Sequence, residues 1–308
     1  MKTLHIIVLL LAAAIIAACG DSYDKAQKLS KEKAAKDRHE DSLALKVGVV
    51  PTLDCLPIFV AKENGLFDSL KTDVRLKTFQ SNIDCDAALA AGRIEGCVTD
   101  IVRGQYLRRR GTALDYVAAT DAYWQMITNR KARIKTLKQL NDKMIAMTRY
   151  SATALLAYYA TDSAGLKREN VFKIQINDMR LRLQMLLNNE MDAMLLTEPY
   201  ATTARLHKHN VLLDSRDKDM RFGVIAFNSK AMKDRRRGQQ LKAFVEGYNK
   251  ACDIINKNGV RHYAALLKKY YKADDKTIAA LPEMKFKHAA APRQKDIETA
   301  DKWLKNTD

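Results

Sequence analysis

The chain has 308 residues, and 47% of them are hydrophobic, so it can bury a full-sized core and is not an intrinsically disordered protein. Its length suits about two ordinary domains. A formal net charge of +17 is compatible with binding to nucleic acid or to an anionic membrane surface. The sequence of the N-terminus distinguishes between these two classes of partner.

The N-terminus has the pattern of a secretory signal peptide. Lys2 precedes an apolar run over residues 4–18, which is shorter than the ~20 residues that a membrane-spanning helix needs. The run ends in IAAC, which resembles the bacterial lipobox, and this resemblance implies that residues 1–18 are removed and that Cys19 is lipidated. The alternative is an ordinary signal peptide with an incidental Cys19.

Lipidation of Cys19 would anchor the protein to a membrane face of the cell envelope, outside the cytoplasm, and in the periplasm if the organism is Gram-negative. An exported lipoprotein does not normally meet nucleic acid, so we expect no nucleic-acid partner. Residues 19–44 form a charged, glycine-poor segment without a broad apolar face. We interpret this segment as a tether, partly helical, that holds the globular part off the membrane.

From Leu45 onward, short apolar runs alternate with helical patterns. The run LKVGVV predicts a strand, and the following helix has Pro57 in its first turn and Gly65 just past its end. This alternation favours a parallel sheet with right-handed crossovers. Further strands of this first series are predicted within residues 73–81, 94–100 and 114–120.

A second series of the same layout predicts strands within residues 143–148, 171–176 and 191–196. Two similar series predict two similar α/β lobes, with crossing strands near residues 123–129 and 222–228. We therefore assign residues 45–126 together with 224–308 to lobe 1 and residues 127–223 to lobe 2.

Polar residues follow several predicted strands, at the edge where open parallel sheets bind ligands. Two such edges that face each other would form a cleft between the lobes. The candidate ligand-binding residues at these strand ends are Thr52, Leu53, Asp54, Asp86 and Asp100 in lobe 1 and Tyr150, Ser151, Thr153 and Glu198 in lobe 2.

Three stretches carry a resemblance to a known family: VGVVPTLDCLPIFVAKENGLF, DAALAAGRIEGCVTD and MLLNNEMDAMLLTEPY. In this order, behind a lipobox, they resemble the SsuA/THI5-like (NMT1) family of sulfonate-, nitrate- and thiamine-precursor-binding proteins, over roughly residues 45–230. The resemblance implies an α/β protein with the type II periplasmic-binding-protein fold, in which two Rossmann-like lobes are joined by two crossing strands.

The same resemblance implies a monomeric binding protein, not an enzyme, that uses no cofactor. Such a protein closes on a small molecule and delivers it to the permease and ATPase subunits of an ABC importer. Two features depart from the family's pattern: Asn189 replaces a typical glycine, and Arg149 to Thr153 stand where the family often has a Gly-Ser turn. The ligand contacts that carry over are Thr52, Leu53, Asp54, Asp100, Ser151, Thr153 and Glu198.

The acidic residues at the strand ends favour an amine-bearing or heteroaromatic ligand, such as a thiamine pyrimidine precursor. Aromatic residues could add a stacking wall for a planar ring, or simply pack at the hinge. An anion such as a sulfonate or nitrate is the alternative, because Ser151 and Thr153 lie near a predicted helix N-terminus and Arg149 adds positive charge. These two residues could equally serve only as a helix cap. The aromatic candidates are Tyr123, Trp124, Tyr150 and Tyr200.

Cys55 and Cys85 follow neighbouring predicted strands, which lie about 4.8 Å apart, so we expect a disulfide between them. Cys97 and Cys252 are expected to be buried and free. No metal site is expected, since no CxxC occurs and His207 and His209 do not share a helix face.

Catalytic motifs are missing from the sequence, which lacks a Gly-x-Ser-x-Gly elbow and a phosphate-binding loop. A pyrimidine-synthesis enzyme on the same scaffold is a further alternative, but its cysteine-rich motif is absent. A surface adhesin that uses the basic face is another. A ligand cleft between the lobes would favour the transport protein over the adhesin.

Overall fold

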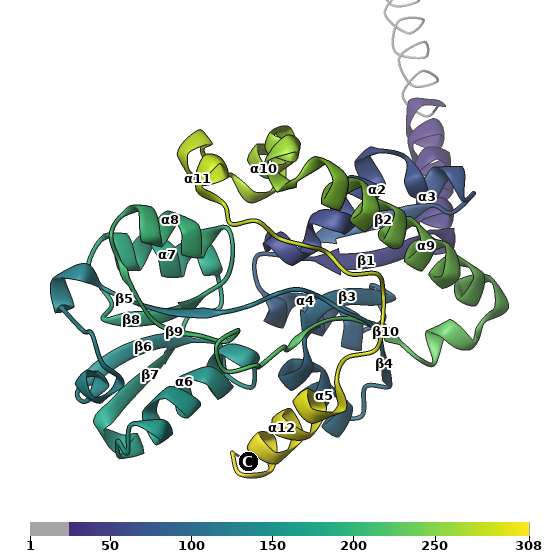
Figure 1. Cartoon of the computed structure of the whole chain (residues 1–308). Coiled ribbons are helices and arrows are strands. Elements are labelled where there is room, and N and C mark those ends of the chain that lie inside the picture. The colour runs from purple at the N-terminus through teal and green to yellow at the C-terminus, as the bar shows by residue number, and fades with distance from the viewer. Residues whose placement is uncertain (1–24, 308) are drawn as a thin grey trace, which may run out of the picture. The chain divides into compact units, whose positions relative to one another are not determined.

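The structure, a computed structural model, describes residues 25–307. Residues 25–43 are helical and mostly exposed, so the described part of the expected tether is a helix (Figure 1). Residues 25–44 belong to one compact unit of the chain and residues 45–307 to another. The predicted signal peptide and the lipidation site Cys19 lie outside the described residues. Within the described part of the chain, no helix combines the length and hydrophobicity needed to span a bilayer.

Lobe 1 is built on a five-stranded sheet in the order β2-β1-β3-β10-β4. β1 pairs in parallel with both β2 and β3, whereas β10 runs antiparallel to its neighbours β3 and β4. The sheet is therefore mixed, although the strand–helix alternation favoured a parallel one. Its strands are β1 (Leu45–Val49), β2 (Val74–Thr78), β3 (Gly96–Asp100), β4 (Leu114–Ala119) and β10 (Gly223–Asn228).

Lobe 2 repeats this arrangement in the order β7-β6-β8-β5-β9, with β5 antiparallel to β8 and β9. β5 and β10 thus hold equivalent places, and each continues a segment that crosses between the lobes (Figure 1). The predicted fold class, two α/β lobes joined by two crossing strands, is confirmed. The strands of this sheet are β5 (Gln125–Thr128), β6 (Lys143–Met147), β7 (Val171–Gln175), β8 (Ala193–Leu196) and β9 (Asn210–Asp214).

The helices of lobe 1 cover both faces of its sheet. Pro57 lies in the first turn of α2 (Leu56–Glu63), where a missing N–H costs no hydrogen bond, and Gly65 follows with φ +64°. α2 and the long α9 (Arg235–Asn258) share one apolar cluster with β1, and α4 (Asn82–Ala90) belongs to a second cluster. The other helical segments are η1 (Leu53–Cys55), α3 (Leu66–Ser69), α5 (Ile101–Arg109), η5 (Ala231–Lys233), η6 (Val260–Tyr263), α10 (Ala264–Tyr271) and α11 (Asp275–Ala280).

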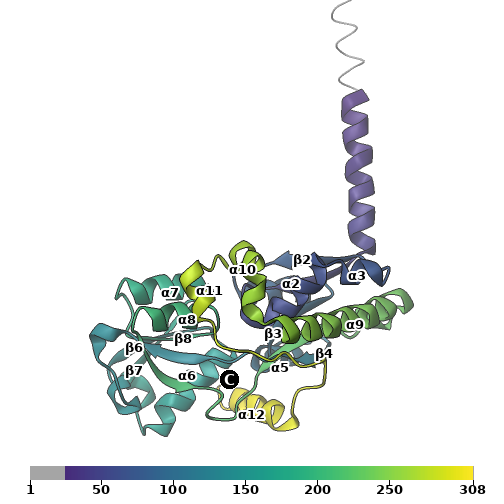
Figure 2. The same cartoon turned by 45° about the horizontal axis from the view of Figure 1, so that its top comes forward.

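The helices of lobe 2 include α6 (Ala152–Ser163), which begins at the cleft edge of the sheet. The C-terminal α12 (Gln294–Lys305) packs on both α5 and α6, and so contacts both lobes (Figure 2). Asn189, at the family's glycine position, has φ +64°, a left-handed conformation that Asn tolerates better than most residues. The other helical segments are η2 (Arg130–Ala132), η3 (Leu137–Leu140), η4 (Arg168–Asn170), α7 (Met179–Leu187) and α8 (Tyr200–Leu206).

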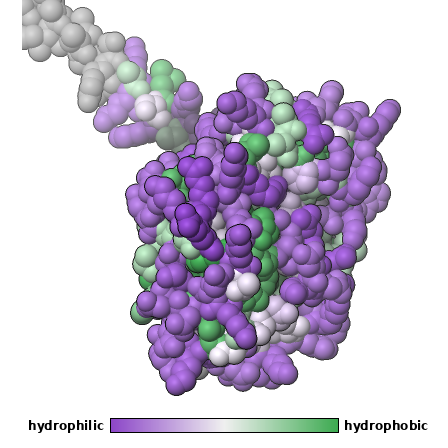
Figure 3. Space-filling model, turned by 60° about the vertical axis from the view of Figure 1, so that its left-hand side comes forward, coloured by the Kyte–Doolittle hydropathy of each residue, from purple (hydrophilic) through white to green (hydrophobic). Residues whose placement is uncertain are grey.

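The surface is mainly hydrophilic on the face seen in Figure 3, which a band of hydrophobic residues crosses. From Leu45 onward, the described large hydrophobic side chains that are exposed all belong to lobe 2, namely Met144, Phe172, Ile174, Leu181 and Leu206.

The predicted disulfide between Cys55 and Cys85 is wrong: both are free and buried, as are Cys97 and Cys252. Cys55 belongs to the apolar cluster under α2, together with Val47 and Val49, whereas Cys85 packs in the α4 cluster. Cys85 lies against Gly48, where an added Cβ would come within 2.4 Å of its Sγ. Because successive residues of β1 point to opposite faces of the sheet, the strand separates the two thiols.

Candidate functional site

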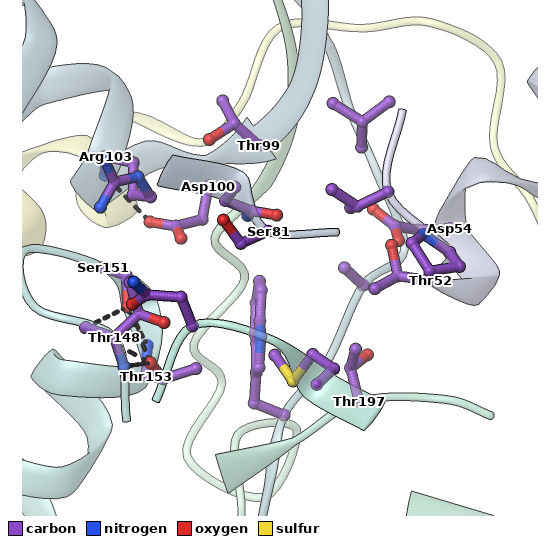
Figure 4. Close-up of a pocket in the computed structure, with 18 of the residues that line it drawn as sticks. Thr52, Asp54, Ser81, Thr99, Asp100, Arg103, Thr148, Ser151, Thr153 and Thr197 are labelled. Atoms are coloured by element: carbon purple, nitrogen blue, oxygen red, sulfur yellow. Dashed lines mark hydrogen bonds between the residues drawn. The ribbon is translucent and has the colours of Figure 1, made fainter. Parts of the chain in front are cut away.

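A cavity with an open mouth lies between the two sheets at the ends of β1, β3 and β6. More than half of the residues that line it have hydroxyl or amide side chains, and Figure 4 shows residues of the two lobes on opposite sides. Its described lining is Val50, Pro51, Thr52, Asp54, Gln80, Ser81, Asn82, Val98, Thr99, Asp100 and Arg103 from lobe 1, Ala122 and Trp124 from the first crossing segment, and Thr148, Ser151, Thr153, Asn177, Met179, Thr197 and Tyr200 from lobe 2.

Asp54 reaches the cavity from η1, the short 3-10 turn that follows β1. Asp54 is 5% exposed, and Thr120 Oγ1 donates a hydrogen bond to its Oδ2 at 2.9 Å. Burial raises the pKa of the Asp54 carboxyl, although its hydrogen bonds with Thr52 and Thr120 act in the opposite direction. Asp54 and Thr52 lie across the cavity from Ser151 and Thr153 (Figure 4). A ligand N–H group would relieve the desolvation of this carboxylate.

Asp100 is the last residue of β3 and the N-cap of α5. Its Oδ1 accepts one hydrogen bond from Arg103 N at 3.0 Å and a second from Ala152 N of lobe 2, also at 3.0 Å. Burial raises the pKa of Asp100 to about 7, and the repulsion from Asp86 adds to this shift, whereas its hydrogen bonds and Arg103 oppose it. One carboxyl group therefore caps a helix of its own lobe and contacts a helix of the other lobe.

The raised pKa of Asp100 predicts a pH dependence of stability. The folded protein binds a proton here between the ordinary pKa of 3.8 and about 7, whereas the unfolded chain has already released it. The proton bound by Asp100 in the folded protein therefore contributes stability at low pH, and this stability is lost as the pH rises through about 7. Urea unfolding should therefore show the wild type losing stability relative to Asp100→Asn between pH 5 and pH 8. Parallel pH profiles of the two proteins would contradict this.

Arg103 is the only described residue with a cationic side chain among those that line the cavity. Its Nε forms a buried ion pair with Asp86, and its guanidinium donates from Nη1 to the Arg149 carbonyl of lobe 2 at 3.0 Å. Asp86 also accepts a hydrogen bond from Thr99 Oγ1 at 3.4 Å. The charge of Arg103 is thus already matched within lobe 1.

The lobe 2 wall is formed where α6 begins. Ser151 caps the helix: its Oγ accepts from Thr153 N at 3.1 Å and donates to the Thr148 carbonyl at 2.7 Å. Thr153 Oγ1 in turn accepts from Thr148 N at 2.9 Å. The fully buried Arg182 supports this turn, because it donates to Thr148 Oγ1 at 2.5 Å. The hydroxyl groups here are therefore held in fixed orientations.

Five predicted contact residues line this cavity: Thr52, Asp54, Asp100, Ser151 and Thr153. The other four predicted residues do not line it. Asp86 faces Arg103, as described above. Tyr150, with φ +51°, stacks on Tyr106 with 4.4 Å between ring centroids.

Leu53 and Glu198 contact each other across the lobes instead. Leu53 N donates to the Glu198 carbonyl at 2.9 Å. The Glu198 carboxylate accepts hydrogen bonds from Tyr123 OH at 2.7 Å and Thr202 Oγ1 at 2.6 Å, and it forms an ion pair with Arg205 at 2.7 Å. All of its strong acceptor capacity is used within the protein.

Several lining residues were missed by the sequence reasoning. Ser81 ends the segment in which a strand is predicted and Asn82 follows it, so the strand-end rule could have found both residues. Of the aromatic candidates, Trp124 and Tyr200 line the cavity and Tyr123 does not. Asn177 and Tyr200 line the cavity, and Asn177 Oδ1 and Tyr200 OH are buried without a hydrogen-bond partner among the described residues.

Comparisons with known proteins give one family and many structures. The model of the NMT1-like family matches residues 38–268. The aliphatic sulphonate binding protein SsuA from Escherichia coli has a TM-score of 0.68 at 19% identity, over 86% of this chain and 87% of that chain. The nitrate-binding protein NrtA from Synechocystis PCC 6803 has a TM-score of 0.67 at 14% identity, over 80% and 74%.

A ligand-binding component of an ABC-type import system from Staphylococcus aureus, solved with zinc bound, has a TM-score of 0.70 at 17% identity, over 85% of this chain and 92% of that chain. At these identities the structural matches establish the fold. No curated protein sequence matches this chain.

Proposed function

The chain belongs to the NMT1-like family, and from this premise we propose that it is the extracytoplasmic solute-binding lipoprotein of an ABC importer. As a monomer anchored through Cys19, it would bind a small polar molecule between its lobes and deliver it to the permease and ATPase subunits. The cavity at the strand ends supports this role, because open α/β sheets bind ligands there. It also favours a transport protein over an adhesin, which would need an extended binding surface.

For the ligand, we favour an amine-bearing or heteroaromatic molecule, such as a thiamine pyrimidine precursor. The observation that carries this choice is the charge balance of the wall: Asp54 and Asp100 face the cavity, whereas its one described cation, Arg103, is paired with Asp86. A cationic group beside these carboxyls would favour their ionised forms and gain charge-assisted hydrogen bonds. The Trp124 ring adds a flat apolar surface for a planar ligand.

A small anion is the second candidate. Its support is the nature of the structural neighbours, among them the sulphonate- and nitrate-binding proteins, together with a hydroxyl-rich wall near the N-terminus of α6. Against it, the first N–H group of α6, that of Ala152, is already bonded to Asp100.

Titration calorimetry separates these candidates. The purified protein should bind a thiamine pyrimidine precursor more tightly than methanesulfonate or nitrate. Asp54→Asn should weaken binding of an amine ligand by about tenfold, because it removes one charged acceptor. Asp115→Asn, a change of the same chemistry at an exposed position of β4, should leave the affinity unaltered. Binding of the anions alone would contradict the proposed ligand class, and binding of none, with no small molecule seen by native mass spectrometry, would contradict the proposed role.

A further inference from the structure

The contact between Asp100 and α6 has a consequence for ligand selection. We propose that the Asp100 carboxyl acts as a built-in ligand of the α6 N-terminus, which holds the ligand-free lobes together and excludes free anions from that position. The second part of this inference deepens the proposed function and rests on it. The first part concerns the lobes alone and does not.

The N-terminus of a helix attracts anions because its first N–H groups lack partners and its dipole is positive there. In α6 the first two of these groups are taken by side chains. Ala152 N donates to Asp100 Oδ1 at 3.0 Å, and Thr153 N donates to Ser151 Oγ at 3.1 Å. An acidic group from lobe 1 thus occupies the place that an anionic ligand would take in lobe 2.

The second Asp100 oxygen, Oδ2, has no hydrogen-bond partner among the described residues, and the side chain lines the cavity. It is therefore available as an acceptor for an N–H group of a ligand. An incoming sulfonate would have to displace Oδ1 from the helix and approach a carboxylate of like charge. An amine would leave the contact with α6 intact and bond to Oδ2.

Other contacts join the lobes around this point. Arg103 Nη1 donates to the Arg149 carbonyl at 3.0 Å, and Leu53 N donates to the Glu198 carbonyl at 2.9 Å. These bonds use backbone acceptors on lobe 2, so they leave its N–H groups free. The Asp100 bond is the one that places an acidic side chain on a helix N-terminus, and it links lobe closure to the charge of the site.

Small-angle X-ray scattering on the ligand-free protein tests the closure. Asp100→Asn keeps an acceptor for both N–H groups and should retain the radius of gyration of the wild type, whereas Asp100→Ala should increase it. Ala152→Pro removes the lobe 2 donor at the first helical position, which tolerates proline, and Ser151 before it is already extended, with φ −138° and ψ 169°. This variant should also be larger than the wild type.

Gln294→Pro is the matched control, since it makes the same change at the exposed first residue of α12. It should scatter like the wild type. If Asp100→Ala and Ala152→Pro both have the radius of gyration of the wild type, the proposed closure is overturned, whether the wild type is open or closed. Because this measurement needs no ligand, its failure is distinct from a failure of the proposed function.

Calorimetric titration with methanesulfonate tests the selection. At pH 8.5, where the Asp100 carboxyl of the wild type is ionised, Asp100→Asn removes the charge while keeping the contact and should bind methanesulfonate at least about tenfold more tightly than the wild type. An unchanged or weaker affinity of Asp100→Asn for methanesulfonate would overturn the role of Asp100 in excluding anions.

Discussion

Replacing Asp86 with alanine is expected to lower the free energy of unfolding by about 3–5 kcal/mol. The Asp86 and Arg103 side chains are 2% and 6% exposed, so the change leaves a guanidinium buried without its counter-charge. Arg103 would also lose the anchor that directs its Nη1 to the Arg149 carbonyl, and the contact between the lobes would weaken. Urea unfolding followed by circular dichroism measures the loss.

The matching double variant, Asp86→Leu with Arg103→Met, should recover much of this stability, because a buried ion pair replaced by apolar side chains of similar volume is often neutral. Asp162→Ala is the control. Its ion pair with Arg168 joins side chains that are 48% and 56% exposed, so its removal should cost less than about 0.5 kcal/mol. Equal losses for Asp86→Ala and Asp162→Ala would show that burial of the pair does not matter.

Arg182→Met should lower the free energy of unfolding by about 3 kcal/mol and weaken ligand binding. Arg182 is fully buried on α7, and burial lowers the pKa of its guanidinium to about 9, which still leaves it charged at neutral pH. It donates to the carbonyls of Ile176 and Leu195 at 2.6 Å and 2.9 Å and to Thr148 Oγ1. Removing it orphans three acceptors at the ends of three strands of lobe 2.

Methionine fills the space of the arginine stem but supplies no hydrogen-bond donor. The stability lost with the three hydrogen bonds should therefore exceed the stability gained when a charge is no longer buried. The stability of Arg182→Lys should lie between those of the wild type and of Arg182→Met, since an ammonium cannot reproduce the planar arrangement of donors of the guanidinium. Arg180→Met, on the exposed side of the same helix, should change stability by less than about 0.5 kcal/mol. A near-neutral Arg182→Met would mean that water replaces all three of its hydrogen bonds.

The order of strands and helices follows from local sequence patterns. Apolar runs that end at a proline or a polar loop, such as LKVGVV before Pro51, mark the strands, and Gly65 marks the end of the helix that follows. Two such series in similar order predicted two lobes and crossing strands near β5 and β10. These signals are local because hydrogen bonding within a helix or a turn depends on neighbouring residues.

The sequence by itself therefore determined the two α/β lobes and predicted that Asp54, Asp100 and Ser151 lie at strand ends. Tertiary structure alone decided what each side chain meets there. Cys55 and Cys85 lie on opposite faces of one sheet. The Glu198 carboxylate is bonded to Tyr123, Thr202 and Arg205. Asp100 accepts a hydrogen bond from a helix of the other lobe. Such pairings depend on how helices turn on the sheets and how the lobes approach each other, and these are set by packing between residues far apart in the chain.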